Sequence, residues 1–334
     1  MCPNARCIKS MLRFPLVRAL AVWGLVSISL FAADEFPNKP VRIIVPFGPG
    51  SGSDVRTRQL VPLLSQRLKQ PIIVDNRPGA AGSIGTQLAA RSSPDGYTVT
   101  YILIGTVCIN PHLDQQTAFN PLRDLVPLIV TMRTALIMAV KADSPIRSVQ
   151  DLIKQAKANP DRFNYGTSGP GSVQHLIGEQ FKKKAGVEML AIPYKGGDGT
   201  TLADLMGGQI DIAFASPLTT MPLVEGGKLR ALAVTSAKRL ANLPNVPTIA
   251  ESGVPGYDET VWSGYAVPAG TPDAIVKKLH SAFQSAMLSP EFREDITQSG
   301  AELIASSQQY AAQLLKADYE RYGKIVKDLG LKAD

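Results

Sequence analysis

The sequence predicts an α/β protein of two lobes with a ligand cleft between them. Short apolar runs alternate with segments of helical periodicity, which is the pattern of a sheet covered by helices. This pattern occurs twice along the chain, and no long linker separates the two occurrences. A chain of 334 residues also exceeds what one hydrophobic core usually serves, so two units are expected.

The first unit follows a β-α-β-α-β order, which predicts a parallel sheet. Its first strand ends in a turn rich in Pro and Gly, and the next helix has Ser53 or Asp54 available as its N-cap. The elements expected here are strands at 41–47, 72–74 and 97–104 and helices over 54–68 and 83–91.

The second unit repeats the scheme, and a mainly helical segment follows it. A capping-box pattern at 148–151 opens the first helix of this unit, and Ser289-Pro290 opens a short helix near the C-terminus. We expect strands at 136–140, 163–165, 188–192, 209–214 and 229–235, and helices over 148–158, 173–185, 272–288 and 308–329. Ligands of such sheets bind at the carboxyl ends of the strands.

Composition excludes several classes of protein. Hydrophobic residues make up 45% of the chain and charged residues 19%, an ordinary globular balance that excludes a disordered or collagen-like chain. The net charge is +7, but residues 1–33 hold four of the 35 basic residues and none of the 28 acidic ones. The rest of the chain therefore carries only +3, too little for the dense basic face of a nucleic-acid binder.

Residues 1–33 predict a cleaved secretory signal peptide. A basic segment precedes an apolar run over 19–31, which is too short to span a bilayer comfortably. The alternative is an uncleaved anchor helix, and the cleavage point is not fixed. We therefore expect an exported, soluble, periplasmic protein. Only Cys108 follows the leader, and the three histidines are scattered, so we expect no disulfide, metal site or cofactor.

Three loops place glycines and hydroxyls directly before a helix. They span 48–54, 78–83 and 168–172. Free N–H groups and the positive end of the helix dipole suit such loops to a carboxylate or phosphate. The alternative is that Gly and Ser serve only as turns and caps. A fourth loop, 194–198, has glycines that allow close backbone approach, and its Lys195 either faces an anion or lies on the surface.

Catalytic signatures are missing, so we expect a binding protein and no catalytic residues. The first loop approaches a dinucleotide fingerprint, but Ser53 stands where the third glycine belongs. Hydrolysis by Ser168 with His175 is a second alternative, although Pro170 breaks the nucleophile-elbow spacing. His175 follows the third loop and either contacts a cleft ligand or packs on its helix. Trp262 and Tyr265 wall the cleft or belong to the core.

With these motifs in view, the chain resembles the Bug receptors, the extracytoplasmic solute-binding proteins of tripartite tricarboxylate transporters. Any one match is weak, but the matching segments run in order through essentially the whole chain after the leader. They lie at 36–47, 49–54, 74–82, 94–98, 109–111, 164–172, 193–196, 207–211, 229–236, 244–248 and 268–272.

This resemblance implies a type II periplasmic-binding-protein fold that closes over a small carboxylate, such as a dicarboxylate, a tricarboxylate or an acidic amino acid. It implies one lobe of residues 34–136 and 260–334 and another of 137–259. The partners would be membrane permease subunits or a sensor kinase, and the receptor a monomer. The implied ligand-binding residues are Phe47, Pro49, Gly50, Ser51, Ser53, Asp54, Thr106, Ser168, Gly171, Ser172, His175, Lys195, Gly196 and Ser216.

Two departures from the family pattern bear on the ligand. Ser51 and Ser53 replace a Gly and a Thr of the first loop, which adds a hydrogen-bond donor. Ala215 and Ser216 stand where the family often has Asp or Asn. The missing acid is expected to weaken recognition of an ammonium group.

Overall fold

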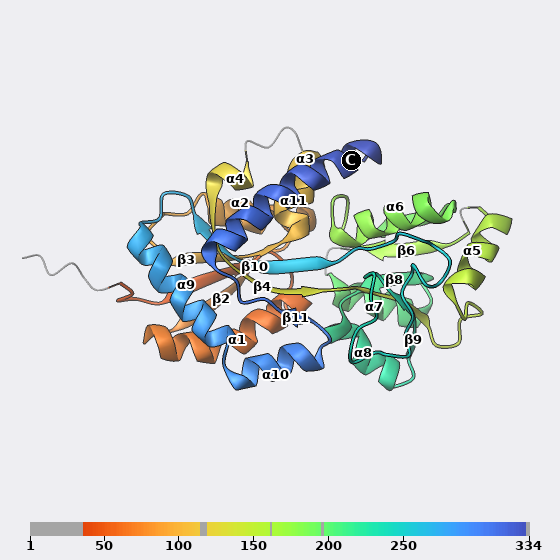
Figure 1. Cartoon of the computed structure of the whole chain (residues 1–334), viewed down its shortest axis with the longest axis horizontal. Coiled ribbons are helices and arrows are strands. Elements are labelled where there is room, and N and C mark those ends of the chain that lie inside the picture. The colour runs from red at the N-terminus through yellow and green to blue at the C-terminus, as the bar shows by residue number, and fades with distance from the viewer. Residues whose placement is uncertain (1–35, 114–118, 161, 195–196, 332–334) are drawn as a thin grey trace, which may run out of the picture. The chain divides into compact units, whose positions relative to one another are not determined.

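The computed structural model describes residues 36–113, 119–160, 162–194 and 197–331, which belong to one compact unit. It contains two β-sheets with helices packed around them, and β4 and β10 run from one sheet toward the other (Figure 1). We call the half with the six-stranded sheet the first lobe and the half with the five-stranded sheet the second lobe. The predicted leader at 1–33 lies outside the described residues.

The first lobe has the strand order β11-β4-β10-β3-β1-β2. Its strands are β1 (Val41–Val45), β2 (Ile72–Asn76), β3 (Thr98–Leu103), β4 (Leu125–Thr134), β10 (Val261–Pro268) and β11 (Glu302–Leu303). Its helices and turns are α1 (Gly52–Leu68), η1 (Ala80–Gly82), α2 (Ser83–Ala90), η2 (Gly105–Ile109), α3 (Asn110–Leu113), α4 (Pro121–Asp124), α9 (Asp273–Met287), α10 (Pro290–Gln298) and α11 (Gln308–Asp328).

The expectation of a parallel sheet is wrong for half of this lobe. β1 pairs in parallel with β2 and β3, but β10 runs antiparallel to both β3 and β4. No strand was predicted at 125–134, where the structure has β4. In the structure Pro127 pairs with Ala266 beside a register shift of β10, where a strand tolerates a residue without N–H.

The second lobe has the strand order β7-β6-β8-β5-β9. Its strands are β5 (Ile137–Lys141), β6 (Asn164–Thr167), β7 (Leu190–Pro193), β8 (Ile212–Ala215) and β9 (Leu229–Val234), and its helices are α5 (Val149–Ala158), α6 (Val173–Ala185), α7 (Asp198–Gly207) and α8 (Pro217–Glu225). β6 is parallel to β7 and β8, whereas β5 is antiparallel to β8 and β9. Here too the sheet is mixed.

Side-chain caps explain where the two helices nearest the cleft begin. The Ser51 hydroxyl accepts a hydrogen bond from the N–H of Asp54, and the Ser172 hydroxyl accepts one from the N–H of His175. Each bond satisfies an N–H that the first helical turn would otherwise leave free. The cap of α1 is thus Ser51, and the expectation of Ser53 or Asp54 is wrong by two or three residues.

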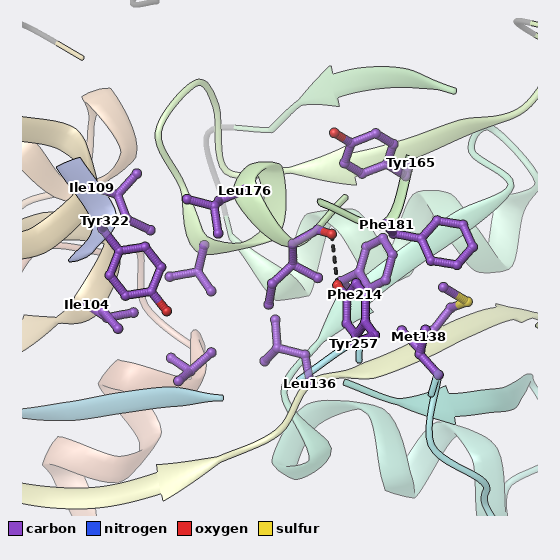
Figure 2. Close-up of a cluster of buried hydrophobic side chains, with 14 of the residues drawn as sticks. Ile104, Ile109, Leu136, Met138, Tyr165, Leu176, Phe181, Phe214, Tyr257 and Tyr322 are labelled. Carbon is purple, nitrogen blue, oxygen red and sulfur yellow. Dashed lines mark hydrogen bonds between the residues drawn. The ribbon is translucent and has the colours of Figure 1, made fainter. Parts of the chain in front are cut away.

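A hydrophobic core connects the two lobes. It includes Ile104, Ile109 and Tyr322 of the first lobe and Phe181 and Phe214 of the second, all nearly inaccessible to solvent (Figure 2). Figure 2 also shows the Tyr257 hydroxyl donating a hydrogen bond to the carbonyl of Ile177, at 2.9 Å. This packing supports the strands that pass between the lobes.

The described residues contain no helix that is both long and apolar enough to cross a membrane. Within the same part of the chain, no three His, Cys, Asp or Glu side chains gather where a metal ion could bind. Cys108 is a buried free thiol whose pKa is raised by desolvation, as expected of a small core residue.

Candidate functional site

A cavity of about 90 Å³ lies where the two lobes face each other. Both lobes contribute to its wall, and the predicted residues that line it are Phe47, Ser51, Ser53, Ser168, Ser172 and Ser216. The first lobe adds Tyr101, Thr134 and Ser263, and the second adds Gln174 and Asp198. The volume accommodates several water molecules, a size that suits a small ligand.

The first loop is ordered by a carboxylate behind it. Asp54 is 3% exposed and accepts hydrogen bonds from the N–H of Gly50 at 2.9 Å and from the side chains of Arg58 and Asn76. Burial raises the pKa of Asp54, but these hydrogen bonds outweigh burial and hold the pKa below its usual value. Asp54 therefore shapes the loop, while Ser51, Gly52 and Ser53 present the N-terminus of α1 to the cavity.

The third loop, 168–172, is arranged in a similar way. The N–H of Gly171 donates to Nδ1 of His175 at 3.3 Å, and the N–H of Gly169 donates to the Thr167 hydroxyl at 3.1 Å. Ser168 and Ser172 face the cavity, with Val173 and Gln174 at the start of α6. His175 thus holds the loop from behind.

The lobes approach each other closely through glycines around the cavity. A Cβ on Gly52 would lie 3.7 Å from the Ser216 side chain, and one on Gly105 would lie 3.1 Å from Cγ2 of Val173. A Cβ on Gly171 would overlap with Oδ1 of Asn110. The structure therefore holds the lobes in contact, and small residues permit that contact.

The other predicted residues that the structure describes do not line this cavity. The Thr106 hydroxyl is 1% exposed and bonds both the N–H and the carbonyl of Leu103. Pro49 and Gly50 are exposed at the loop tip. Asp54, Gly171 and His175 act behind the wall as described above. Lys195 and Gly196 lie outside the described residues, so their predicted roles stay predictions.

The loop at 78–83 lines a second cavity of about 430 Å³ that adjoins the first. The two cavities share Phe47, Ala81, Ser168 and Gly197. Asn110 fixes this loop, because its side-chain amide donates to the Ala81 carbonyl and to the Ser83 hydroxyl, each at 3.1 Å. Trp262 and Tyr265 line neither cavity and are buried, so they belong to the core.

Asp198 is the charged group that we did not predict in the wall. Its carboxylate accepts hydrogen bonds from the N–H of Ser216 at 3.1 Å, from the amide of Gln174 at 3.2 Å and from the hydroxyl of Thr219 at 3.3 Å. Burial raises the pKa of Asp198 above its usual value despite these bonds. The glycines of its loop, 194–198, predicted close backbone approach to a ligand. No local pattern indicated that the Asp198 side chain would reach Ser216.

The described cavity wall contains no Lys, Arg or His. Its polar groups are mainly hydroxyls and the backbone N–H groups at the starts of α1 and α6. Such donors can hold a carboxylate through charge-assisted hydrogen bonds without a basic side chain.

Comparison with known proteins places these features in a family. Residues 56–331 match the model of the tripartite tricarboxylate transporter family receptor. The chain belongs to this receptor family. The expected resemblance to Bug receptors is thereby confirmed, and the chain is a solute-binding protein rather than an enzyme.

Solved structures confirm the expected fold of this receptor. The periplasmic binding protein BugD is 30% identical, with a TM-score of 0.85, and the match covers 90% of this chain and 100% of that one. A Rhodopseudomonas palustris protein solved with adipate is 34% identical, with a TM-score of 0.85 and the same coverage. MatC of Rhodopseudomonas palustris, with bound malate, is 27% identical, with a TM-score of 0.83, over 87% of this chain and 100% of MatC.

Proposed function

We propose that this receptor binds a small dicarboxylate or related carboxylate in the periplasm and delivers it to a tripartite tricarboxylate-type transporter. The observation that carries the proposal is a cavity walled by hydroxyls and by two capped helix N-termini. These groups are donors, and a carboxylate is an acceptor of several hydrogen bonds. Adipate and malate in two related structures support the same class.

The two loops would hold the ligand from opposite sides. Gly52 and Ser53 offer N–H groups and Ser51 and Ser53 offer hydroxyls from the first lobe, and Ser168 and Ser172 offer hydroxyls from the second. The positive ends of the α1 and α6 dipoles face the same space. Ser216 completes the wall at the start of α8.

Closure of the lobes would couple ligand binding to transport. The lobes are taken as residues 34–136 with 260–334, and 137–259. A ligand shifts such a protein toward the closed form only if it binds that form more tightly than the open one. Because the loops contribute donors from both lobes, a carboxylate completes its hydrogen bonds only when the lobes meet. The closed monomer would then be the form that membrane permease subunits recognise, after export directed by residues 1–33.

A thermal-shift screen on purified protein, unfolded and refolded to remove any carried ligand, tests this proposal. The panel holds succinate, malate, adipate, citrate, aspartate, glutamate, benzoate and glucose. A ligand at about 100 times its Kd should stabilise the protein by about 2.7 kcal/mol, which shifts the midpoint by several degrees. Stabilisation by glucose alone, or by none of the carboxylates, would contradict carboxylate binding.

Delivery to a transporter needs its own experiment. Deleting the gene should abolish uptake of the carboxylate that gives the largest thermal shift, and the intact gene should restore it. Normal uptake in the deletion strain would rule out the transport role while leaving carboxylate binding intact.

A further inference from the structure

Asp198 places a carboxylate at the start of a neighbouring helix. It is the first residue of α7, and its Oδ2 accepts hydrogen bonds from the N–H of Ser216 at 3.1 Å and from the hydroxyl of Thr219 at 3.3 Å. Ser216 is the N-cap of α8, and its side chain makes no capping bond. A negative charge at a helix N-terminus is stabilised by free N–H groups and by the helix dipole. Contacts within the chain therefore hold the Asp198 carboxylate in the second-lobe wall of the cavity.

This carboxylate retains the capacity to accept a further hydrogen bond. Its Oδ1 accepts one bond, from the side-chain amide of Gln174 at 3.2 Å, and an ionised carboxylate offers about four acceptor positions on its two oxygens. The partners that the described residues provide, Gln174, Ser216 and Thr219, are all neutral. The described cavity wall contains no Lys, Arg or His. The charge of Asp198 is therefore not paired with a basic group of this wall.

An unpaired carboxylate in a cavity wall discriminates between ligands. Asp198 is half-buried, so its carboxylate is only partly hydrated and its charge is screened less than in bulk water. It repels a carboxylate of the ligand that comes close to it. A ligand hydroxyl or ammonium group instead donates a charge-assisted hydrogen bond to it, which is stronger than a bond between neutral groups. Asp198 thus favours ligands that bring a donor to this part of the wall.

The donors for the ligand's own carboxylate lie close to Asp198. The N–H groups of Gly52 and Ser53, in the first turn of α1, have no backbone acceptor among the described residues, and both residues line the cavity. The starts of α1 and α8 are neighbours, since a Cβ on Gly52 would lie 3.7 Å from the Ser216 hydroxyl oxygen. The Ser216 N–H in turn bonds Asp198. A donor that reaches Asp198 therefore has to be attached close to the carboxylate that α1 holds.

We propose that Asp198 selects a carboxylate that carries a hydroxyl or ammonium group on the neighbouring carbon. The N–H groups at the start of α1 hold the carboxylate, and the hydroxyl or ammonium group donates to Asp198. This inference rests on the proposed carboxylate-binding function and narrows its ligand class, because 2-hydroxy and 2-amino acids are favoured over unsubstituted acids. Asp198 is a specificity-determining residue of the cavity.

A ligand series on the parent protein tests this preference by isothermal titration calorimetry. Succinate, malate and aspartate share one carbon chain and differ only in the hydrogen, hydroxyl or ammonium at C2. The better enantiomer of malate and of aspartate should each bind more tightly than succinate, on the order of tenfold. The position of the donor is tested with 2-hydroxyglutarate and 3-hydroxyglutarate against glutarate, and only the 2-hydroxy isomer should gain affinity.

Asp198→Asn keeps the shape of the side chain and removes its charge. The preference for aspartate over succinate should fall on the order of tenfold, and the preference for malate over succinate should fall less, because a hydroxyl carries no charge. Asp204 provides the matched control, since it lies on the same helix and accepts from the Tyr194 hydroxyl at 2.8 Å without lining the cavity. Asp204→Asn should keep the preferences of the parent. If Asp198→Asn does not fold, Asp198→Ser removes the same charge.

The outcomes separate the two proposals. A parent that binds succinate as tightly as malate and aspartate would overturn the selective role of Asp198 and leave the carboxylate-binding function standing. Variants at Asp198 that keep both preferences of the parent, or a gain for 3-hydroxyglutarate equal to that for the 2-hydroxy isomer, would do the same. A parent that binds no carboxylate at all would overturn both proposals.

Discussion

The two walls of the cavity share one design but differ in charge. Each begins a helix with a serine cap, Ser51 in the first lobe and Ser172 in the second. Asp198 lines the cavity from the second lobe, whereas the described first-lobe residues of the wall have no charged side chain. The comparison teaches that the two helix starts are alike, and that one acidic side chain distinguishes the two sides of the cavity.

Asp198 also revises an expectation drawn from the sequence. Ala215 and Ser216 lack the acid that the family often has there, which suggested weak recognition of an ammonium group. In the structure Asp198 accepts a hydrogen bond from the N–H of Ser216, so a carboxylate stands beside that position after all. This carboxylate belongs to Asp198, the first residue of α7.

The largest expected effect comes from preventing contact between the walls. Gly171→Ala places a methyl group against Asn110 of the opposite lobe, at a backbone with φ of 76° that alanine also resists. If the closed form becomes rare, affinity for malate or adipate should fall on the order of a hundredfold. Calorimetry measures the affinity, and small-angle scattering with saturating ligand measures closure.

Gly186→Ala is the control for this variant. Gly186 also has a positive φ, 64°, but a Cβ there would meet no atom within 4 Å. It should lose stability and keep the parent affinity. Equal affinity losses in both variants would mean that backbone strain, and not contact between the lobes, explains the Gly171→Ala result.

Removing the negative charge of Asp198 should raise the affinity for a carboxylate ligand, whereas Gly171→Ala should lower it. Asp198→Asn keeps an oxygen that can accept from Ser216 but removes the negative charge from the wall, so affinity for adipate should rise by about tenfold. Calorimetry checks the value. Asp204→Asn, on the same helix and bonded to the Tyr194 hydroxyl, should leave affinity unchanged. Weaker adipate binding by Asp198→Asn would show that the carboxylate assists the ligand.

The raised pKa of Asp198 predicts that the free energy of unfolding depends on pH. The pKa of Asp198 in the folded protein lies above its usual value, because burial disfavours the charged form. The folded state therefore binds this proton more tightly than the unfolded state, and the resulting stability is lost as pH rises through the folded pKa. Denaturant melts from pH 4 upward should show a smaller decline for Asp198→Asn than for the parent. Parallel pH profiles would contradict the assignment.

A second buried acid, away from the cavity, sharpens the comparison. Glu259 is 5% exposed, accepts from the Tyr322 hydroxyl and has its pKa raised by burial. Glu259→Gln should also flatten the decline of stability with rising pH, by the same sign argument. Because Glu259 does not line the cavity, adipate affinity should not change. An affinity change comparable to that of Asp198→Asn would mean that charge acts through lobe closure and not at the wall.

The smallest effects are expected from the serine caps at the starts of α1 and α6. Ser51→Ala and Ser172→Ala each remove a helix cap and should each lower the free energy of unfolding by about 1 kcal/mol. Denaturant melts measure both. Markedly unequal losses would show that one serine does more than cap its helix.

Local chemistry made much of the secondary structure predictable. The helix expected over 173–185 is α6 itself, and the helices expected over 148–158, 272–288 and 308–329 differ from α5, α9 and α11 by at most one residue at each end. Apolar spacing and caps act within a few residues, so a sequence displays them directly. The long strands β4 and β10 are not among the strands predicted from local pattern, because each is stabilised mainly by a partner more than a hundred residues away.

The sequence by itself determined the two α/β units, the loops that begin α1 and α6, and a likeness to carboxylate receptors. Those properties depend on periodicity and on residues adjacent in the chain. Only the tertiary structure decided that β4 pairs with β10 and that Asp198 reaches Ser216. Burial and charge pairing arise from segments that folding brings together, and the spacing of residues along the chain does not encode them locally.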